Sequence, residues 1–480
     1  MVKFKSQSSD QMFLLPPTLD DLVSQDALAR VVSEVVEALD LTLLYHKYSL
    51  DGRPAYHPKM MLKVLFYAYA NGIRSSRKIE QRLQQDTHFM FLAGMETPDH
   101  RTISDFRKHN MDLLKTLFTQ IVLLCVEMGM VSVGHIAIDG SKIKASASKK
   151  QSKDADRLQQ EIEKLEREIS AVFAEAEQID HAEDQQFGKN QRGDELPGEI
   201  QDKVNRLQRL KQAKALLAQR GWNKINLTDS DSRFMQMPAK LEVCYNAQAA
   251  VDSDHQVIIA NDVVTEANDQ HQFIPMYEQA VDNVGKAPAE VSADCGYANH
   301  PNYKYMQQHV KDAYVPPVHH SSKNQAADQA APTDYTKDKF SYDAEHDLYR
   351  CPEGRPLSYF YTKTEHDIAM RIYRSDDCSN CPAHDLCHRR GYQAKQRTLK
   401  IYETDSYIDQ IRQKLKTDVG KQTYCNRLAT VEPTFGNMKF NLGFDHFLLR
   451  GQEKVRGEFD LMCIAHNLNK IYRYKMATAA

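Results

Sequence analysis

The order of strand-like and helical segments between residues 133 and 318 restricts the fold of this chain more than any other feature. The segment VGHIAIDGSKIKAS at 133–146 is rich in β-branched residues and contains a glycine turn. Strand character returns at Leu241 in two runs, NAQAAVD and QVIIANDVV, which the residues SDH separate. A helix (His271 to Val284), a strand (AEVSADCGY), a helix (Asn299 to Val310) and a last strand (DAYVPPV) are then expected.

Two segments interrupt this order. From 151 to 180, apolar residues recur at alternating steps of four and three, which is an a/d heptad pattern. A polar break and a second helical stretch, Ile200 to about Gln219, predict an antiparallel coiled hairpin. The second interruption is rich in cysteine. Without both, a three-strand meander followed by alternating helices and strands remains, which is the order of an RNase H-like α/β core. The heptad positions are Leu158, Ile162, Leu165, Ile169, Val172, Ala176 and Ile179.

The first 130 residues read as mostly helical. An apolar run, MMLKVLFYAYANG, follows Pro58 and predicts a buried helix that stops at a glycine. The residues TPD cap a second helix, HRTISDFRKHN, in which Ile103 and Phe106 would face inward. Arg101, Arg107 and Lys108 would then face outward, as in a helix-turn-helix that contacts DNA. A plain helical bundle is the alternative interpretation.

Three acidic residues stand out by their positions. Asp139 closes the first strand, Asp294 closes the fourth, and Glu432 lies in the helix-like segment TVEPTFGNMKF. Carboxylates at the ends of neighbouring strands can converge, and three hard oxygen donors suit Mg²⁺ or Mn²⁺. Taken one by one, the aspartates could instead be turn formers before glycine, and Glu432 an exposed helix start.

Five strings occur in order along the chain: PDHRTISDFRK, AIDGSKIKA, TDSDSRFM, SADCGY and RLATVEPTFGNMKFNLGFDHFLLRG. This ordered set, over residues 10–475, resembles the DDE transposases of bacterial insertion sequences, in the IS eleven-eighty-two group of the RNase H-like superfamily. The resemblance implies that Asp139, Asp294 and Glu432 form a triad that holds two Mg²⁺ or Mn²⁺ ions per active site.

The resemblance also implies a set of DNA-binding residues and a reaction. Tyr424, Arg427, Glu432 and Lys439 match the Tyr-Arg-Glu-Lys signature of such families, although four residues separate Arg427 from Glu432 where three are commoner. Glu432 and Lys439 are seven residues apart and would lie on one side of a helix. Metal-activated water would cut the element's ends, and the freed 3′-hydroxyl would attack target DNA. Double-stranded DNA and a homodimer or higher oligomer are the expected partners. A catalytically silent, domesticated DNA-binding protein and an RNase H-like nuclease are the alternatives.

A group of four cysteines falls within 37 residues. Cys351, Cys378, Cys381 and Cys387 supply one C-x2-C pair and two further thiols, enough for a structural zinc ion. His384 or His388 could replace one thiolate, and four reduced thiols without metal are the alternative.

Charge and hydropathy limit the class of protein. The net charge is −3, yet residues 388–475 carry 17 Lys and Arg against 9 Asp and Glu, which indicates a surface for a polyanion or a solvated helical face. No apolar run is long enough to span a membrane and no secretory signal is recognisable, so a cytoplasmic location is expected. The resemblance to bacterial transposases further implies association with the nucleoid. The predicted regions are 1–130 (DNA-binding), 131–318 (core, with a helical insertion at 150–222), 319–400 (cysteine-rich insertion) and 401–480 (helices that complete the core).

Overall fold

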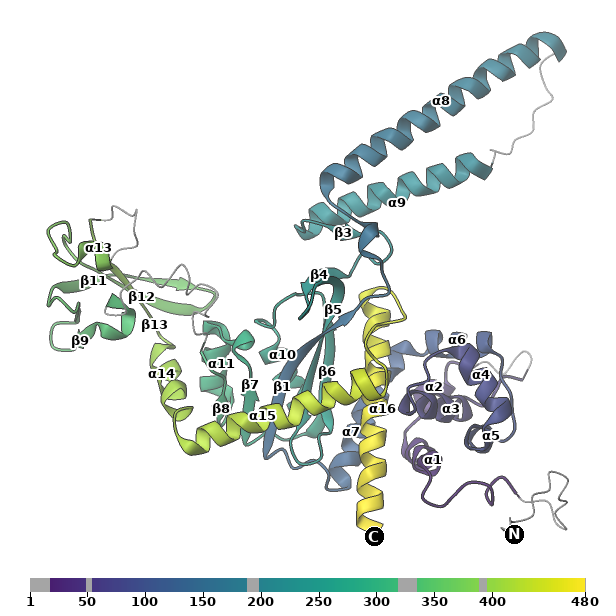
Figure 1. The fold of residues 1–480 in the computed structure, drawn as a ribbon, viewed down its shortest axis with the longest axis horizontal. Helices are drawn as coiled ribbons and strands as arrows, with labels where there is room; N and C mark the ends of the chain where they lie inside the picture. Colours follow the sequence, from purple (N-terminus) through teal and green to yellow (C-terminus); the bar gives the residue numbers. More distant parts are fainter. Residues whose placement is uncertain (1–17, 49–53, 188–197, 318–334, 388–394, 480) are drawn as a thin grey trace, which may run out of the picture.

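A computed structural model describes residues 18–48, 54–187, 198–317, 335–387 and 395–479. Figure 1 shows a central sheet with a group of N-terminal helices on one side and a smaller, separate sheet on the other. A long helical hairpin projects from the central part. The chain is therefore a mixed α/β protein, as the sequence predicts.

The N-terminal part is helical in the way that its sequence predicts. Helix α3 begins with Pro58 at its first position and ends just before Gly72, whose φ of 71° suits only glycine well. The Asp99 side chain accepts a hydrogen bond from the Thr102 amide (2.7 Å) and caps α6, whose Ile103 and Phe106 are buried. The helices described here are α1 (Leu28–Ala38), α2 (Thr42–Tyr45), α3 (Pro58–Ala70), α4 (Ser76–Gln85), α5 (Thr87–Ala93), α6 (His100–His109) and α7 (Met111–Glu127).

The central sheet has the strand order β6-β5-β1-β7-β8, and β4 pairs with the remaining length of the β5 edge. Neighbours β6, β5 and β1 are antiparallel, whereas β1, β7 and β8 are parallel. A three-strand meander and two parallel strands thus occur in the predicted order. The strands are β1 (His135–Lys144), β4 (Arg233–Gln236), β5 (Leu241–Asp252), β6 (Ile258–Val264), β7 (Glu290–Ala293) and β8 (Ala313–Tyr314).

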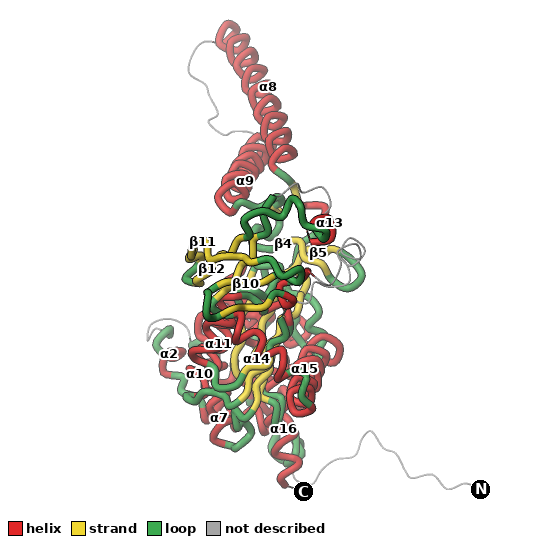
Figure 2. Tube along the Cα trace, turned by 90° about the vertical axis from the view of Figure 1, so that its left-hand side faces the viewer, coloured by secondary structure: helices red, strands yellow, loops and turns green. Residues whose placement is uncertain are grey.

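Helices cover both faces of this sheet (Figure 2). Helices α10 (Phe273–Val284) and α11 (His300–His309) lie on one side, and α15 (Asp418–Gly436) lies on the other. Helix α15 crosses the strands and contacts β8, β7, β1 and β5. Helix α16 (Gln452–Ala479) packs against α7, α3 and β6. Because both faces are covered, the part of β5 that follows Glu242 is fully buried and rich in small apolar residues.

The predicted helical hairpin is present between two short paired strands, β2 (Ser152–Lys153) and β3 (Ile225–Asn226). Its helices are α8 (Ala155–Phe187) and α9 (Gly198–Arg220). The seam closes on itself at its base, where the first three heptad positions pack against Leu210, Ala213 and Leu217. Farther along α8, Ile169 and Val172 are only half-buried. The side chains of Ala176 and Ile179 lie outside the described residues.

The cysteine-rich region contains a sheet that the sequence analysis did not predict. It forms five antiparallel strands in the order β13-β12-β11-β10-β9, on a core of Phe340, Leu357, Tyr373 and Leu399. Most side chains of β11 are exposed, and these include the aromatic residues Tyr359, Phe360 and Tyr361. The strands are β9 (Ser341–Asp343), β10 (Leu348–Arg350), β11 (Pro356–Glu365), β12 (Ile368–Arg374) and β13 (Thr398–Tyr402), with α13 (His384–Cys387) and α14 (Asp405–Lys414) beside them.

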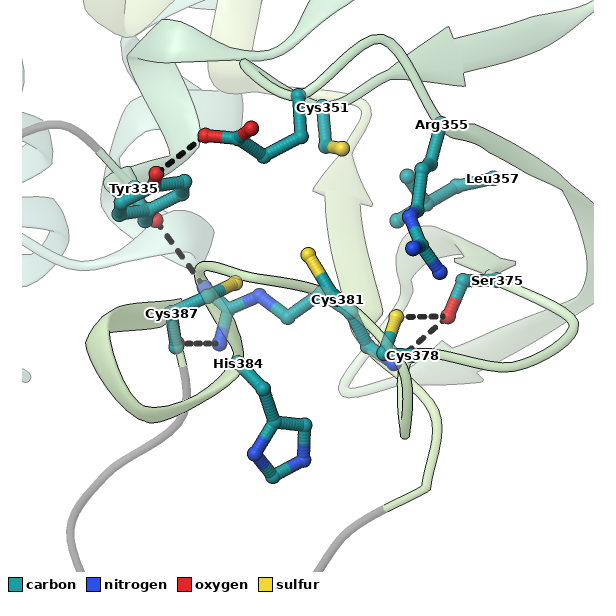
Figure 3. A pocket seen from close by; sticks show the side chains of 11 residues that line it. Tyr335, Cys351, Arg355, Leu357, Ser375, Cys378, Cys381, His384 and Cys387 are labelled. Carbon is teal, nitrogen blue, oxygen red and sulfur yellow. Dashed lines mark hydrogen bonds between the residues drawn. The ribbon is translucent and has the colours of Figure 1, made fainter.

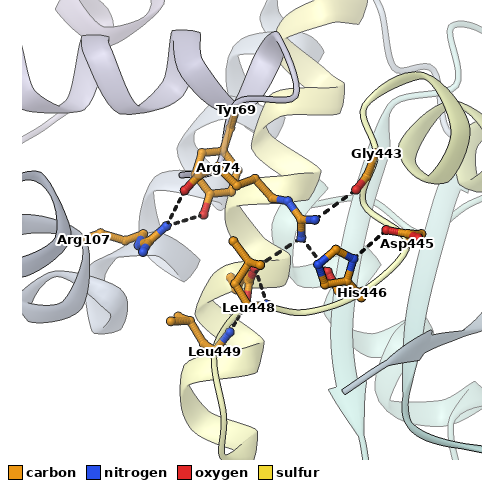
Figure 4. Close-up of polar contacts among 9 residues, drawn as sticks. Tyr69, Arg74, Arg107, Gly443, Asp445, His446, Leu448 and Leu449 are labelled. Carbon is orange, nitrogen blue, oxygen red and sulfur yellow. Dashed lines mark hydrogen bonds and ion pairs between the residues drawn. The ribbon is translucent and has the colours of Figure 1, made fainter. Parts of the chain in front are cut away.

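A buried ion pair connects the N-terminal helices to the C-terminal part (Figure 4). The Arg74 guanidinium lies 3.5 Å from the Glu458 carboxylate and donates to the carbonyls of Gly443 (3.0 Å) and His446 (2.5 Å). Glu458 on α16 is completely buried, and its carboxylate accepts hydrogen bonds from the backbone amides of Leu448 and Leu449. Burial raises the pKa of Glu458, and the nearby Arg74 cation opposes this increase.

No helix among the described residues is both long and apolar enough to cross a membrane.

Replacing Arg74 by alanine should lower the free energy of unfolding by about 3–5 kcal/mol, because it leaves the Glu458 carboxylate buried without a cation. Urea denaturation followed by circular dichroism measures this change. The control is Arg77→Ala on α4, an exposed arginine, which should alter stability by no more than about 0.5 kcal/mol. Equal effects of the two substitutions would contradict a structural role for the ion pair.

Candidate active site

Two of the predicted acids lie side by side where the parallel pairing of β1 with β7 ends. Ile138 on β1 and Ala293 on β7 are the last pair in register, and Asp139 and Asp294 directly follow them. Asp294 follows the last residue of β7, as predicted, whereas β1 continues to Lys144 in its pairing with β5, so the prediction that Asp139 closes its strand was wrong. Both are half-buried. The structure thus brings together two acids that are more than 150 positions apart in the sequence.

Asp139 lies in a polar but largely buried environment. Its Oδ2 is 3.0 Å from the Arg427 guanidinium of α15, and its Oδ1 accepts a hydrogen bond from the Gly140 amide (2.8 Å). Burial is the main reason that the pKa of Asp139 is raised to about 6. Arg427 opposes this increase, whereas the nearby carboxylates of Asp294 and Asp269 add to it. The site therefore concentrates negative charge, and Arg427 is the cation that contacts Asp139 directly among the described residues.

Asp294 starts a short turn and not a long helix. Its Oδ1 accepts a hydrogen bond from the Gly296 amide (2.8 Å), which caps a single 3-10 turn at Cys295–Tyr297. A Cβ at Gly296 would lie 2.8 Å from this same oxygen, so only glycine leaves room for the turn. The turn thereby fixes the position of the Asp294 carboxylate beside β1.

Helix α15 and the π-helical turn Asn437–Asn441 that follows it carry two cations of the predicted signature, Arg427 and Lys439. Besides its contact with Asp139, the Arg427 guanidinium lies 5.5 Å from the Tyr424 ring centre. Lys439 Nζ donates to Ser141 Oγ (2.6 Å) and to the Lys142 carbonyl (3.1 Å), two and three residues beyond Asp139. Burial lowers the pKa of Lys439. Arg427 therefore contacts Asp139 directly and Tyr424 lies beside Arg427, whereas Lys439 contacts the segment of β1 that follows Asp139.

Glu432 differs from this expectation. Its side chain is exposed on α15, and it has no hydrogen bond or ion pair with any described residue. The structure also differs from the prediction that Glu432 and Lys439 share one side of a regular helix, because α15 passes into a π-helix at Asn437–Asn441. The wider turn of a π-helix shifts the direction of the residues that follow. The structure thus brings Asp139, Asp294 and Arg427 together, and among the described residues it does not group Glu432 with the two aspartates.

The sequence analysis missed a third carboxylate at this place. Asp269 follows β6, and its Oδ1 accepts hydrogen bonds from the Asn246 and Gln248 amides of β5 (2.6 and 2.7 Å). Lys142 forms an ion pair with the same oxygen at 3.4 Å. The sequence carried one signal that could have found it, since Asp269, like Asp294, comes soon after a core strand on the chain.

The predicted DNA-contacting residues of α6 do not all face solvent. Arg101 and Lys108 are exposed. Arg107 points inward instead of outward, because its guanidinium donates to the Tyr69 hydroxyl (3.1 Å) and the Arg74 carbonyl (3.0 Å), as Figure 4 shows. A half-buried arginine with two protein acceptors supports the helix packing in this region, and its outward placement was wrong.

The four predicted zinc ligands line one pocket (Figure 3). Cys351 precedes a turn to β11, Cys378 and Cys381 lie on the loop after β12, and Cys387 ends α13. The neighbouring thiols contribute to the raised pKa of Cys387, after the larger effect of burial. The His384 ring in Figure 3 turns away from the sulfur atoms, and His388 lies outside the described residues.

Among the described residues, neither the carboxylates nor the thiols are arranged as a complete set of metal ligands. Within the described ranges, no three His, Cys, Asp or Glu side chains come close enough together to hold one ion. The donor chemistry nevertheless fits the predicted metals, since the carboxylates are hard oxygen ligands and the four thiols are soft ones.

Comparisons with known proteins give two family matches. Residues 350–472 match a family model described as "Transposase DDE domain", and residues 17–109 match one described as "Transposase domain (DUF772)". No curated protein matches the chain. Among solved structures, a cryo-EM structure of the piggyBac transposase synaptic complex with hairpin DNA is similar at 9% identity and a TM-score of 0.31, over 94% of this chain and 73% of that one. This score is too low to bear on the fold.

Proposed function

We propose that this chain, which carries the two family domains typical of bacterial insertion-sequence transposases, cuts DNA at the ends of such an element and joins the freed ends to target DNA. The observation that carries the proposal is the pair Asp139 and Asp294, which lie next to each other just beyond the last in-register pair of β1 and β7. The strand order β6-β5-β1-β7-β8, with its three antiparallel and then two parallel neighbours, supports an RNase H-like core.

A transposase DDE domain implies the use of a divalent metal, typically Mg²⁺. We assign Asp139 and Asp294 as ligands of two Mg²⁺ or Mn²⁺ ions, and Glu432 as the third acid, whose exposed side chain has no competing partner among the described residues. The metal ions, when bound, activate the attacking hydroxyl and stabilise the leaving oxygen. Such ions would also neutralise the carboxylates that raise the pKa of Asp139.

The basic residues of α15 and of the π-helical turn after it have separate tasks in this proposal. Arg427 holds the Asp139 carboxylate by an ion pair at 3.0 Å and favours its ionised form. Lys439, anchored on β1 by Ser141 and Lys142, would bind a DNA phosphate near the cut. Tyr424, whose ring lies beside the Arg427 guanidinium, would contact DNA from its own place on α15. One phosphodiester is exchanged for another in strand joining, so the chain needs no nucleotide cofactor.

The other regions supply DNA contacts and structure. Arg101 and Lys108 on the exposed side of α6 would contact phosphates of the element's inverted ends, with residues 1–130 as the DNA-binding region. The core would comprise 131–318 and 401–480, with the helical hairpin at 150–222 and the cysteine-rich part at 319–400 as insertions. A homodimer or higher oligomer would let each subunit cut one end. A silent DNA-binding protein or a nuclease without joining activity would differ in the assays below.

Asp139→Asn and Asp294→Asn should each reduce nicking of a duplex that carries the element's ends by at least about a hundredfold in Mg²⁺ or Mn²⁺. Glu432→Gln should do the same if it is the third acid. Gel electrophoresis of labelled DNA measures nicking and joining, and a gel shift measures end binding, which should persist.

The matched control is Asp418→Asn, a fully exposed acid on the same helix as Glu432. Nicking that survives in the aspartate variants would remove the proposal. Cleavage without any joined product would favour a nuclease.

Replacing Arg427 by methionine should move the acid limb of the nicking rate to higher pH. The reason is that Arg427 lowers the pKa of Asp139, which stands at about 6 with the arginine in place. Without this cation the pKa rises further, so a higher pH is needed to ionise the ligand; about one pH unit or more is expected. The pH dependence of nicking measures the shift, and Arg427→Lys should restore part of it. An unchanged profile would show that Arg427 does not control Asp139.

We also propose that the four cysteines hold a structural zinc ion, since they line one pocket and supply four soft ligands. Elemental analysis of protein purified without chelator should find about one zinc per chain. Cys351→Ser and Cys381→Ser should reduce the zinc content and the thermal stability, whereas Cys425→Ser, which alters an exposed cysteine on α15, should do neither. Less than about half an equivalent of zinc in the unaltered protein would argue for four reduced thiols.

A further inference from the structure

We infer that Asp269 is a positioning residue of the active centre, which holds the segments bearing Asp139 and Asp294 in place and whose negative charge strengthens cation binding between them. This inference rests on the proposed function, because it assigns a task to a residue beside the proposed metal ligands. Asp269 lies between β6 and α10, and its side chain is 18% exposed. It is the carboxylate that the family signature did not indicate and that the fold brings to the site.

Two buried side-chain amides of β5, those of Asn246 and Gln248, hold the Asp269 carboxylate in place. Asn246 and Gln248 are fully buried, and they stand two residues apart on β5, so their side chains lie on the same face. In the strand register they lie opposite Lys142 and Gly140 of β1. Both amides donate to Asp269 Oδ1. Because a buried amide without an acceptor is costly, this arrangement fixes the carboxylate firmly.

Asp269 lies close to two glycines, one beside each aspartate, and the absence of a Cβ at Gly140 leaves the space that its carboxylate occupies. A Cβ at Gly140, next to Asp139, would lie 2.6 Å from Asp269 Oδ1 and closer still to the Gln248 amide. A Cβ at Gly296, two residues after Asp294, would lie 3.5 Å from Asp269 Oδ2. The two oxygens of one carboxylate therefore rest over the two backbone segments that carry the proposed ligands.

A second connection closes the network. Tyr297, in the turn that Asp294 caps, is fully buried, and its hydroxyl donates to Gln248 Oε1. Gln248 thus links Asp269 to the Asp294 turn through its two amide atoms. Since Oδ1 accepts every hydrogen bond described for Asp269, Oδ2 keeps its charge toward the Asp294 side, where it adds to the negative potential that attracts a divalent cation.

Two substitutions separate the charge of Asp269 from its shape. Asp269→Asn keeps the size and one acceptor oxygen but removes the charge, so the affinity for Mn²⁺ should fall about tenfold while the melting temperature changes little. Electron paramagnetic resonance of free Mn²⁺ measures this affinity without any DNA reaction. Nicking by this variant should need about tenfold more Mn²⁺ for half-maximal rate, and should recover at saturating metal.

Asp269→Ala removes both charge and anchor, so nicking should fall about 10–100-fold even at saturating Mn²⁺. The control is Asp282→Asn, an exposed acid on the neighbouring helix α10, which should leave affinity and nicking unchanged. Unaltered Mn²⁺ affinity and metal dependence in Asp269→Asn would overturn the inference while the proposed function stands. An unaltered protein that neither binds Mn²⁺ nor nicks DNA would overturn both. If Asp269→Ala does not fold, the asparagine variant alone decides.

Discussion

The ion pair between Asp139 and Arg427 is the contact on which the candidate site depends, because it joins the central strand of the sheet to the helix that crosses it. An aspartate that is largely buried beside two other carboxylates is unfavourable unless a cation compensates it. Arg427 supplies that cation from α15, and α15 in turn contacts four strands of the sheet. The position of this helix and the ionisation of Asp139 are therefore two consequences of one contact.

The sequence predicted the order of the core elements well, because strands buried on both faces leave long apolar runs. β5, β6 and the first four residues of β1 are of this kind, and the helices α10 and α11 between the later strands follow the ordinary apolar period. Asp139 and Asp294 were found because each follows a short apolar run, although β1 continues past Asp139 to Lys144. The five-stranded sheet of the cysteine-rich region escaped notice because its longest strand, β11, is exposed on most positions.

The rest of the site depends on contacts that no local pattern encodes. Arg107 was expected at the surface from its helical position. Instead, the hydroxyl of Tyr69 on α3 and the backbone carbonyl of Arg74, in the loop after α3, hold its guanidinium inside. Asp269 joins the site only because β5 presents two buried amides to it. The side of α15 that Glu432 occupies follows from how the helix lies on the sheet, and the π-helix after Gly436 changes the direction of Lys439. Tertiary packing decides each of these positions.

The helical hairpin has a mechanical consequence. Helix α8 has 33 residues, and at a rise of about 1.5 Å per residue it extends roughly 50 Å from its base. Its base is held by a two-residue strand pair and a small apolar cluster. A lever of this length amplifies movement, so tilting it by about 10° displaces its far end by roughly 9 Å. A force applied to the far end of the hairpin therefore exerts a large torque on its base, which lies close to the chain that leads into β5.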